Sequence, residues 1–218
     1  HLEAAMERVL SGPERKSRVM NPKEKEIIAY HEVGHALIAH LLPDTDPVHK
    51  VTILPRGMAL GYTLQLPKED RFLVSNTDIE HKIQVLMGGR IAEEIIMGSI
   101  TSGASNDIER ATELARNYIC TYGMSPVLGS RKYGQQSKNV FLGRDYSDHS
   151  KDYSDYTAKQ IDAGIQDLIQ VNYDKAKQLL TRYQSVLVAV SENLMRVETL
   201  DKDQFVALVD PLIENHIE

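Results

Sequence analysis

Hydrophobic residues recur every three to four positions along most of the chain, the spacing that places them on one face of an α-helix. The clearest such segment starts at Pro22, which suits the first turn of a helix, and follows Asn21, which can cap it. Its apolar stripe includes Ile27 and Ile38, and Pro43 ends it. We expect helices over residues 22–42, 77–98, 105–122, 152–183, 186–196 and 201–209.

Two short segments instead alternate apolar and polar residues, as half-buried strands do. They are "VHKVTILP" (48–55) and "LGYTLQLP" (60–67), separated by "RGMA", which suits a turn. We predict a small hairpin or two edge strands here. Residues 124–150, rich in glycine and polar side chains, predict a long loop. The expected fold class is therefore mainly α-helical with a small β-sheet or hairpin.

Two adjacent glycines, Gly88 and Gly89, interrupt the predicted helix over residues 77–98. Each costs about 1 kcal/mol relative to alanine in a helix, so they do not serve helix stability. We predict that they permit a close crossing with another helix.

The composition indicates a globular domain and excludes several functions. Hydrophobic residues make up 42% of the chain, and the net charge of -6 gives no basic surface for nucleic acid, which we do not expect as a partner. The single cysteine, Cys120, excludes an internal disulfide and a four-cysteine zinc site, and it favours a reducing compartment. We interpret Cys120 as a buried apolar residue rather than a nucleophile.

The organisation along the chain suggests one domain after a linker. Residues 1–20 contain "SGPERKSR" and predict the linker, and residues 21–218 predict the domain. No run of about 18 apolar residues and no signal peptide occurs, so the fragment is expected to be soluble by itself, with any membrane anchor outside it.

The strongest chemical signal is "YHEVGHALIAH" (30–40), in the middle of the first predicted helix. His31 and His35 are four residues apart, so both rings can face one metal ion, and both lie on a largely apolar stripe. Glu32 is one step round the helix, where it can take a proton from a water that attacks a carbonyl. The plainer interpretation is that two packed or solvated histidines share a helix face by chance.

A catalytic zinc site also needs a third protein ligand. His40 lies about 140 degrees from His35 round the helix, on the wrong face. The credible ligands are the downstream carboxylates of Glu93, Glu94 and Asp107, and spacing alone does not choose among them.

Three blocks of sequence resemble a known family. "HEVGHALIAHLLPDTDPVHKVTILPRGMALGYT", "LMGGRIAEEIIMG" and "TSGASNDIERATELARN" look like the peptidase domain of the FtsH family, membrane-anchored, ATP-dependent zinc metalloproteases. The likeness runs from about Leu2 to the C-terminus, and several separate blocks in one order make it specific.

This resemblance implies a zincin-like active-site helix and a complete Zn²⁺ site. His31, His35 and Asp107 match the family's three zinc ligands, and Glu32 matches its general base. Val33 stands where alanine is commoner, at a position that is not a ligand. Ser105 could cap the helix that carries Asp107. With Asp107 as the third ligand, Glu93 and Glu94 become candidates for orienting a ligand histidine.

The resemblance also implies a larger parent protein. No P-loop occurs in this chain, so the ATP-using module that unfolds substrates would lie outside it, joined through residues 1–20. The implied parent is a homo-hexamer that degrades membrane and soluble or unfolded polypeptides. It is anchored in a membrane, expected to be the bacterial inner membrane, with this domain facing the cytoplasm.

Two other functions stay open at this point. A helical assembly platform could hold structural zinc without cutting, although such a site closes its fourth position and needs no base like Glu32. A helical interaction module without metal would purify free of zinc.

Overall fold

The computed structural model describes residues 21–55, 60–67, 73–134 and 152–214. The predicted linker over residues 1–20 and the "RGMA" turn lie outside the described residues, as does most of the long loop predicted over residues 124–150. The described part of that loop, residues 124–134, contains no helix or strand.

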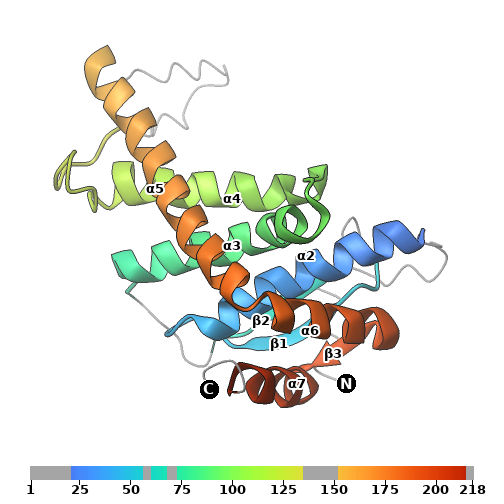
Figure 1. The fold of residues 1–218 in the computed structure, drawn as a ribbon. Coiled ribbons are helices and arrows are strands. Elements are labelled where there is room, and N and C mark those ends of the chain that lie inside the picture. Colours follow the sequence, from blue (N-terminus) through green and yellow to red (C-terminus); the bar gives the residue numbers. More distant parts are fainter. Residues whose placement is uncertain (1–20, 56–59, 68–72, 135–151, 215–218) are drawn as a thin grey trace, which may run out of the picture.

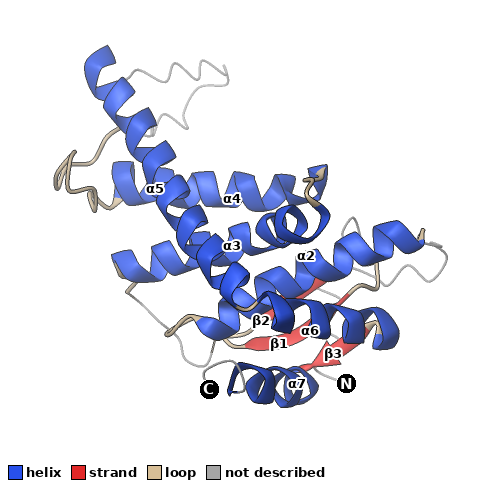
Figure 2. Cartoon of the chain, in the orientation of Figure 1, coloured by secondary structure: helices blue, strands red, loops and turns tan. Residues whose placement is uncertain are grey.

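The described residues are mainly helical, with a small sheet, which confirms the expected fold class (Figures 1 and 2). Each predicted helix is present with similar bounds. The helices, labelled as in Figure 1, are α2 (Pro22–Leu41), α3 (Asn76–Met97), α4 (Ser105–Arg116), α5 (Asp155–Arg182), α6 (Gln184–Val197) and α7 (Lys202–Glu214). A 3-10 turn (Ser102–Ala104) precedes α4, and a π-helical turn (Asn117–Thr121) continues it.

The central helix is α2, and the sequence explains where it begins. The side chain of Asn21 accepts a hydrogen bond from the backbone N–H of Lys23 at 3.1 Å, and Pro22 occupies the first turn. Ten residues between Ala29 and Ala39 are buried. They face in all directions round the helix because α3, α6 and the sheet each pack against a different part of it.

The sheet has three antiparallel strands in the order β2-β1-β3. Strand β1 (Val48–Thr52) is central, β2 (Tyr62–Gln65) forms one edge and β3 (Thr199–Asp201) the other. The predicted hairpin is confirmed for β1 and β2, but β1 is not an edge strand and the prediction missed β3. A three-residue strand is too short to show an alternating pattern. The sheet packs against α2, and α7 contacts β1 and β3.

Helices α2 and α3 cross with their backbones in contact. A Cβ atom added to Gly34 would lie 2.4 Å from the carbonyl oxygen of Gly88, and one added to Gly88 would lie 2.6 Å from the carbonyl oxygen of Gly34. Neither position can hold a larger residue without separating the helices. The predicted close crossing at Gly88 is confirmed.

Helix α5 crosses α3 and fixes it from the outside (Figure 1). The buried amide of Gln84 donates to the side-chain oxygen of Asn172 at 2.9 Å. The carboxylate of Glu94 accepts hydrogen bonds from the hydroxyl of Tyr173 and, at 2.8 Å, from the Nζ of Lys177. These bonds hold α3 in place independently of apolar packing.

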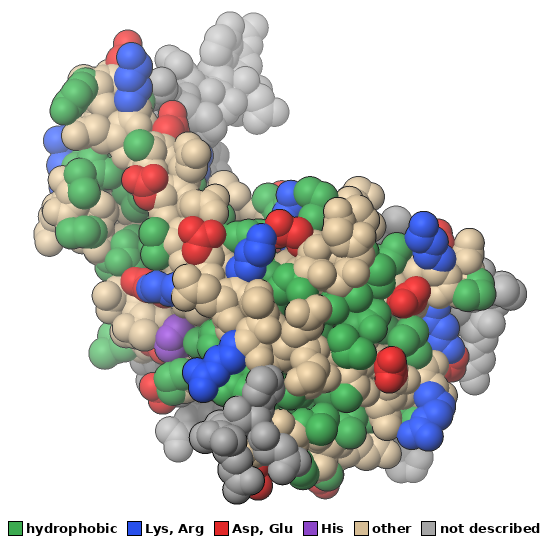
Figure 3. Space-filling view, viewed as in Figure 1, with side chains coloured by type: hydrophobic (Ala, Val, Ile, Leu, Met, Phe, Trp, Pro, Cys, Tyr) green, Lys and Arg blue, Asp and Glu red, His purple; other side chains and the backbone are tan. Residues whose placement is uncertain are grey.

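The described helices include none long and apolar enough to cross a membrane. On the face drawn in Figure 3, acidic and basic side chains are interspersed among apolar ones.

The crossing gives a stability prediction. Gly34→Ala should lower the free energy of unfolding by about 3 kcal/mol, because the new methyl group meets a backbone carbonyl that cannot rotate away. Urea denaturation would measure the change. The control is Gly164→Ala in α5, where the added Cβ meets only the end of the Ile119 side chain, at 3.0 Å. Alanine favours the helix there, so the control should lose no stability. Equal stabilities of the two variants would contradict the role of the crossing.

Candidate metal centre

An open cleft of about 1690 Å³ runs between β2, α2, α3 and α4. His31, Glu32, His35 and Asp107 all line it. Its volume exceeds the range of about 300–1,000 Å³ usual for small-molecule pockets, so the cleft has room for a segment of polypeptide.

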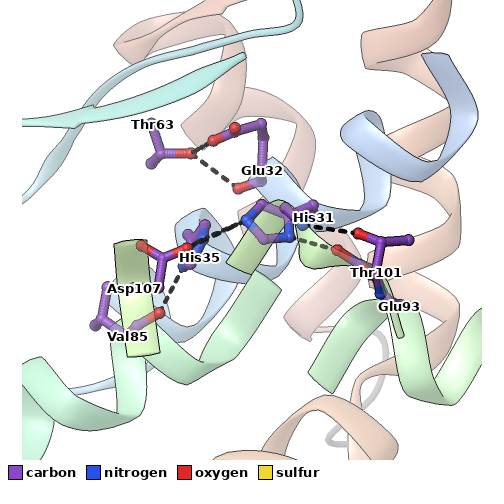
Figure 4. A network of polar contacts seen from close by, with 9 residues as sticks. His31, Glu32, His35, Thr63, Val85, Glu93, Thr101 and Asp107 are labelled. Atoms are coloured by element: carbon purple, nitrogen blue, oxygen red, sulfur yellow. Dashed lines mark hydrogen bonds and ion pairs between the residues drawn. The ribbon is translucent and has the colours of Figure 1, made fainter. Parts of the chain in front are cut away.

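The structure brings the two histidines and Asp107 together at one point of this cleft (Figure 4). The Oδ2 atom of Asp107 lies 3.4 Å from the Nε2 of His31 and 3.4 Å from the Nε2 of His35. The two Nε2 atoms are 3.0 Å apart. Ligands that surround a tetrahedral Zn²⁺ at about 2.1 Å are about 3.4 Å from one another, so these three atoms are spaced to share one ion.

Gly89 has no side chain, which leaves space beside the metal-binding nitrogens of His31 and His35. A Cβ atom at Gly89 would lie 2.6 Å from the Nε2 atoms of both His31 and His35. The second glycine of the pair therefore lets α3 pass directly against the metal-binding nitrogens. Together with the nitrogen and oxygen donor set, this open space fits a zinc ion held by His31, His35 and Asp107.

Asp107 reaches the histidines from the first turn of α4. The predicted cap by Ser105 is wrong: Ser105 is the first residue of α4, and the preceding residue, Ala104, makes no side-chain cap. The short turn before α4 explains the difference, since Thr101 caps that turn instead, accepting a hydrogen bond from the N–H of Gly103. The helix dipole at the start of α4 still favours a carboxylate at Asp107.

Each histidine ring is oriented by a partner on α3. The Nδ1 of His31 lies 2.7 Å from the Oε1 of Glu93, and the Nδ1 of His35 lies 2.7 Å from the carbonyl oxygen of Val85. The other oxygen of Glu93 accepts a hydrogen bond from the backbone N–H of Thr101 at 2.7 Å. These contacts turn both Nε2 atoms toward Asp107.

Three other residues weighed in the sequence analysis, Glu94, His40 and Cys120, do not belong to the metal centre. Glu94 points away from His31 and contacts α5, so the histidine partner is Glu93 and not its neighbour. His40 is paired with Asp210 at 2.7 Å, away from the cleft, as its position on the helix indicated. Cys120 is buried in the core, as predicted.

Glu32 is held by a residue that the sequence analysis did not identify. The hydroxyl of Thr63, on β2, lies 2.9 Å from the Oε2 of Glu32 and 2.9 Å from its backbone oxygen (Figure 4). Burial raises the pKa of the Glu32 carboxyl above its ordinary value, against the opposite effect of the nearby histidines. No spacing rule connects Thr63 to Glu32, because the contact depends on how β2 packs on α2.

Comparison with known proteins identifies the family. The model of peptidase family M41 matches residues 18–208.

The chain belongs to peptidase family M41. It is 50% identical over 206 residues to a protein of Slackia heliotrinireducens, and that match covers 94% of this chain and 26% of the relative. It is 48% identical to a protein of Magnetococcus marinus over 95% of this chain and 31% of the relative. A protein of Bacillus subtilis is 47% identical over 96% of this chain and 33% of the relative. All three relatives are named ATP-dependent zinc metalloprotease FtsH, and the predicted family is confirmed.

This M41 chain spans between about a quarter and a third of the length of these relatives. The described residues of this M41 domain place the histidine pair and Asp107 in one cleft that Glu32 also lines.

In this M41 domain, the carboxylates of Asp107 and Glu93 favour a proton on His31. Burial opposes the charged imidazolium, but hydrogen bonds to Asp107 and Glu93 outweigh burial and raise the pKa of His31 to about 10. Burial alone would raise the pKa of the Asp107 carboxyl. Its hydrogen bonds with His31 and His35 outweigh burial and hold this pKa well below the ordinary value. Glu93, bonded to His31 and Thr101, also has a lowered pKa despite its burial.

This proton predicts the pH dependence of metal binding. Zn²⁺ must displace the proton from His31, whereas Asp107 is already ionised. The affinity for Zn²⁺ should therefore rise about tenfold for each unit of pH between neutrality and about pH 10. Competition with a chelating indicator across this range would measure the slope. An affinity that is independent of pH would contradict a proton on His31.

The two adjacent glutamates give a matched pair of variants. Glu93→Gln should lower Zn²⁺ affinity about 10- to 100-fold, because it weakens the contact that orients His31. Glu94→Gln should leave Zn²⁺ affinity unchanged, because Glu94 contacts Tyr173 and Lys177 on α5. Titration with Zn²⁺ and a competing chelator would compare them. Equal losses in both variants would show that Glu93 has no special role at the centre.

Proposed function

We propose that this chain is the zinc endopeptidase domain of an FtsH-type, ATP-dependent protease. His31, His35 and Asp107 hold the metal, and Glu32 is the general base. The observation that supports this most strongly is the meeting of these three ligands in a cleft that Glu32 also lines. The names of the relatives, each a zinc metalloprotease, support the choice of metal.

When bound, zinc supplies a Lewis acid that polarises the attacking water and the scissile carbonyl. Glu32 takes one proton from that water as its oxygen bonds to the carbonyl carbon. The same carboxyl then gives the proton to the leaving nitrogen as the C–N bond breaks, so Glu32 ends the cycle ionised. Its buried position and raised pKa favour the first transfer, because a more basic carboxylate accepts a proton more readily.

The substrate is an unfolded polypeptide segment lying in the cleft. Strand β2 lines the cleft and is an edge strand of the described sheet. An extended peptide can add to such an edge through backbone hydrogen bonds, which depend little on side-chain sequence. This mode of binding suits a protease that acts on many proteins.

The parent protein has an ATPase module, assembles as a homo-hexamer and degrades membrane and soluble proteins. It is anchored in a membrane, which we propose is the bacterial inner membrane, with this domain facing the cytoplasm. The relatives' names include ATP dependence, and the relatives are about three to four times as long as the matched region, which leaves room for further modules.

A purely structural zinc site is the weaker alternative. Such a site closes its fourth position with a protein ligand, whereas the described ligand group has three members and opens on a cleft. A buried glutamate beside the ligands has no function in a platform, and its burial carries a desolvation cost.

The test is cleavage of unfolded casein by the zinc-loaded chain and by its Glu32→Gln variant. Cleavage should fall at least about 100-fold in the variant, because glutamine cannot accept the proton of the water. Zinc content is measured in both proteins, and it should be equal because Glu32 is not a ligand. Cleavage at the parent rate by the metallated variant would exclude Glu32 as the base, whereas inactivity of both metallated proteins would favour the assembly platform.

A further inference from the structure

The carboxylate of Glu32 has one side-chain hydrogen-bond partner within the described part of the chain, the hydroxyl of Thr63. The Oγ1 of Thr63 lies 2.9 Å from the Oε2 of Glu32 and 2.9 Å from the backbone oxygen of the same residue. A hydroxyl has one proton to donate, so it serves one of these two acceptors at a time. Thr63 therefore contacts both ends of the residue that performs the proposed proton transfers.

The strand that carries Thr63 is pressed against α2 at this point. A Cβ atom on Gly61 would lie 2.8 Å from the Cγ2 of Ile28 and 3.0 Å from the Cγ of Glu32. On its other side β2 is paired with β1, where Thr63 lies opposite Val51. The position of the hydroxyl is thus fixed both by the sheet and by the close approach of Gly61.

We propose that Thr63 is a positioning residue, which holds the Glu32 carboxylate in the orientation needed to reach the attacking water. This inference rests on the proposed role of Glu32 as the base. A glutamate side chain has three rotatable bonds, and without a partner its carboxylate would sample several orientations. A bond from a fixed strand restricts it to one, and positioning of this kind acts on the chemical step.

The two acceptors let Thr63 serve both charge states of Glu32. When Glu32 is ionised, the hydroxyl donates to its carboxylate. When Glu32 has taken the proton of the water, the backbone oxygen is still available, so the hydroxyl proton has an acceptor throughout the cycle. Thr63 neither gains nor loses a proton: one proton passes from water to Glu32 and from Glu32 to the leaving nitrogen.

The experiment compares Thr63→Val with Thr63→Ser in the zinc-loaded 218-residue chain. Valine keeps the shape of threonine and its preference for strands but removes the hydroxyl, whereas serine keeps the hydroxyl. We expect Thr63→Val to lower kcat for labelled casein about tenfold, the effect of one hydrogen bond, with KM within about twofold of the parent. Thr63→Ser should stay within about threefold of the parent in both constants.

A second measurement requires no turnover. A peptide hydroxamate binds zinc, and its hydroxyl can donate a hydrogen bond to the carboxylate of a nearby base. Its affinity should fall about tenfold in Thr63→Val, should fall in Glu32→Gln, and should be retained in Thr63→Ser. Zinc content, measured alongside, should be equal in all the variants.

The outcomes separate this inference from the proposed function. If metallated Glu32→Gln cleaves casein as the parent does, the proposed role of Glu32 as the base fails whatever Thr63 does. If Glu32→Gln is inactive but Thr63→Val keeps the full kcat, the positioning role is wrong. If the parent itself does not turn over, undiminished hydroxamate affinity in Thr63→Val overturns the inference. Loss of zinc in Thr63→Val would also overturn it, because the residue would then support the fold and not the orientation of Glu32.

Discussion

The backbone contact between Gly34 and Gly88 is the constraint on which the rest of the site depends. A helix that carries both histidines of a metal centre must come within reach of partners on another helix, and ordinary side chains would hold the two axes about 8–10 Å apart. The two glycines remove that spacer, since a Cβ at either would meet the other's carbonyl. Only then can Val85 and Glu93, on opposite sides of the crossing along α3, reach the rings of His35 and His31.

The site is held by the close helix crossing and by hydrogen bonds, and apolar packing alone would not fix the directions of the ligand atoms. Each ring is fixed by one hydrogen bond at Nδ1, and the third ligand arrives from a separate helix whose N-terminal N–H groups suit a carboxylate. Asp107 and Glu93 place negative charge beside His31 and raise its pKa, which favours a proton there. The same charges that hold this proton are the ones that attract a divalent cation. A proton and a metal ion therefore compete for His31 and the negative charge around it.

Local signals in the sequence predicted the helices, the histidine pair and the glycines on the α3 side of the crossing, because each depends on residues close together in the chain. The choice between Glu93 and Glu94 could not be made this way, since it depends on a rotation of α3 that its contacts with α2 and α5 determine. Asp107 came from the family resemblance, not from spacing. Strand β3 and the contact between Thr63 and Glu32 were missed because both arise from long-range packing, and the cap expected at Ser105 failed because a 3-10 turn precedes α4.

All four residues of the candidate centre lie in the first half of the sequence, whereas α5, α6, β3 and α7 contribute none of them. Those later elements cover α3, complete the sheet and pack against α2. During synthesis on the ribosome, the ligands therefore emerge before the helices that pack over α2 and α3. A nascent chain would carry the ligands and the α3 residues that orient them before the later elements that cover α3 and complete the sheet have emerged.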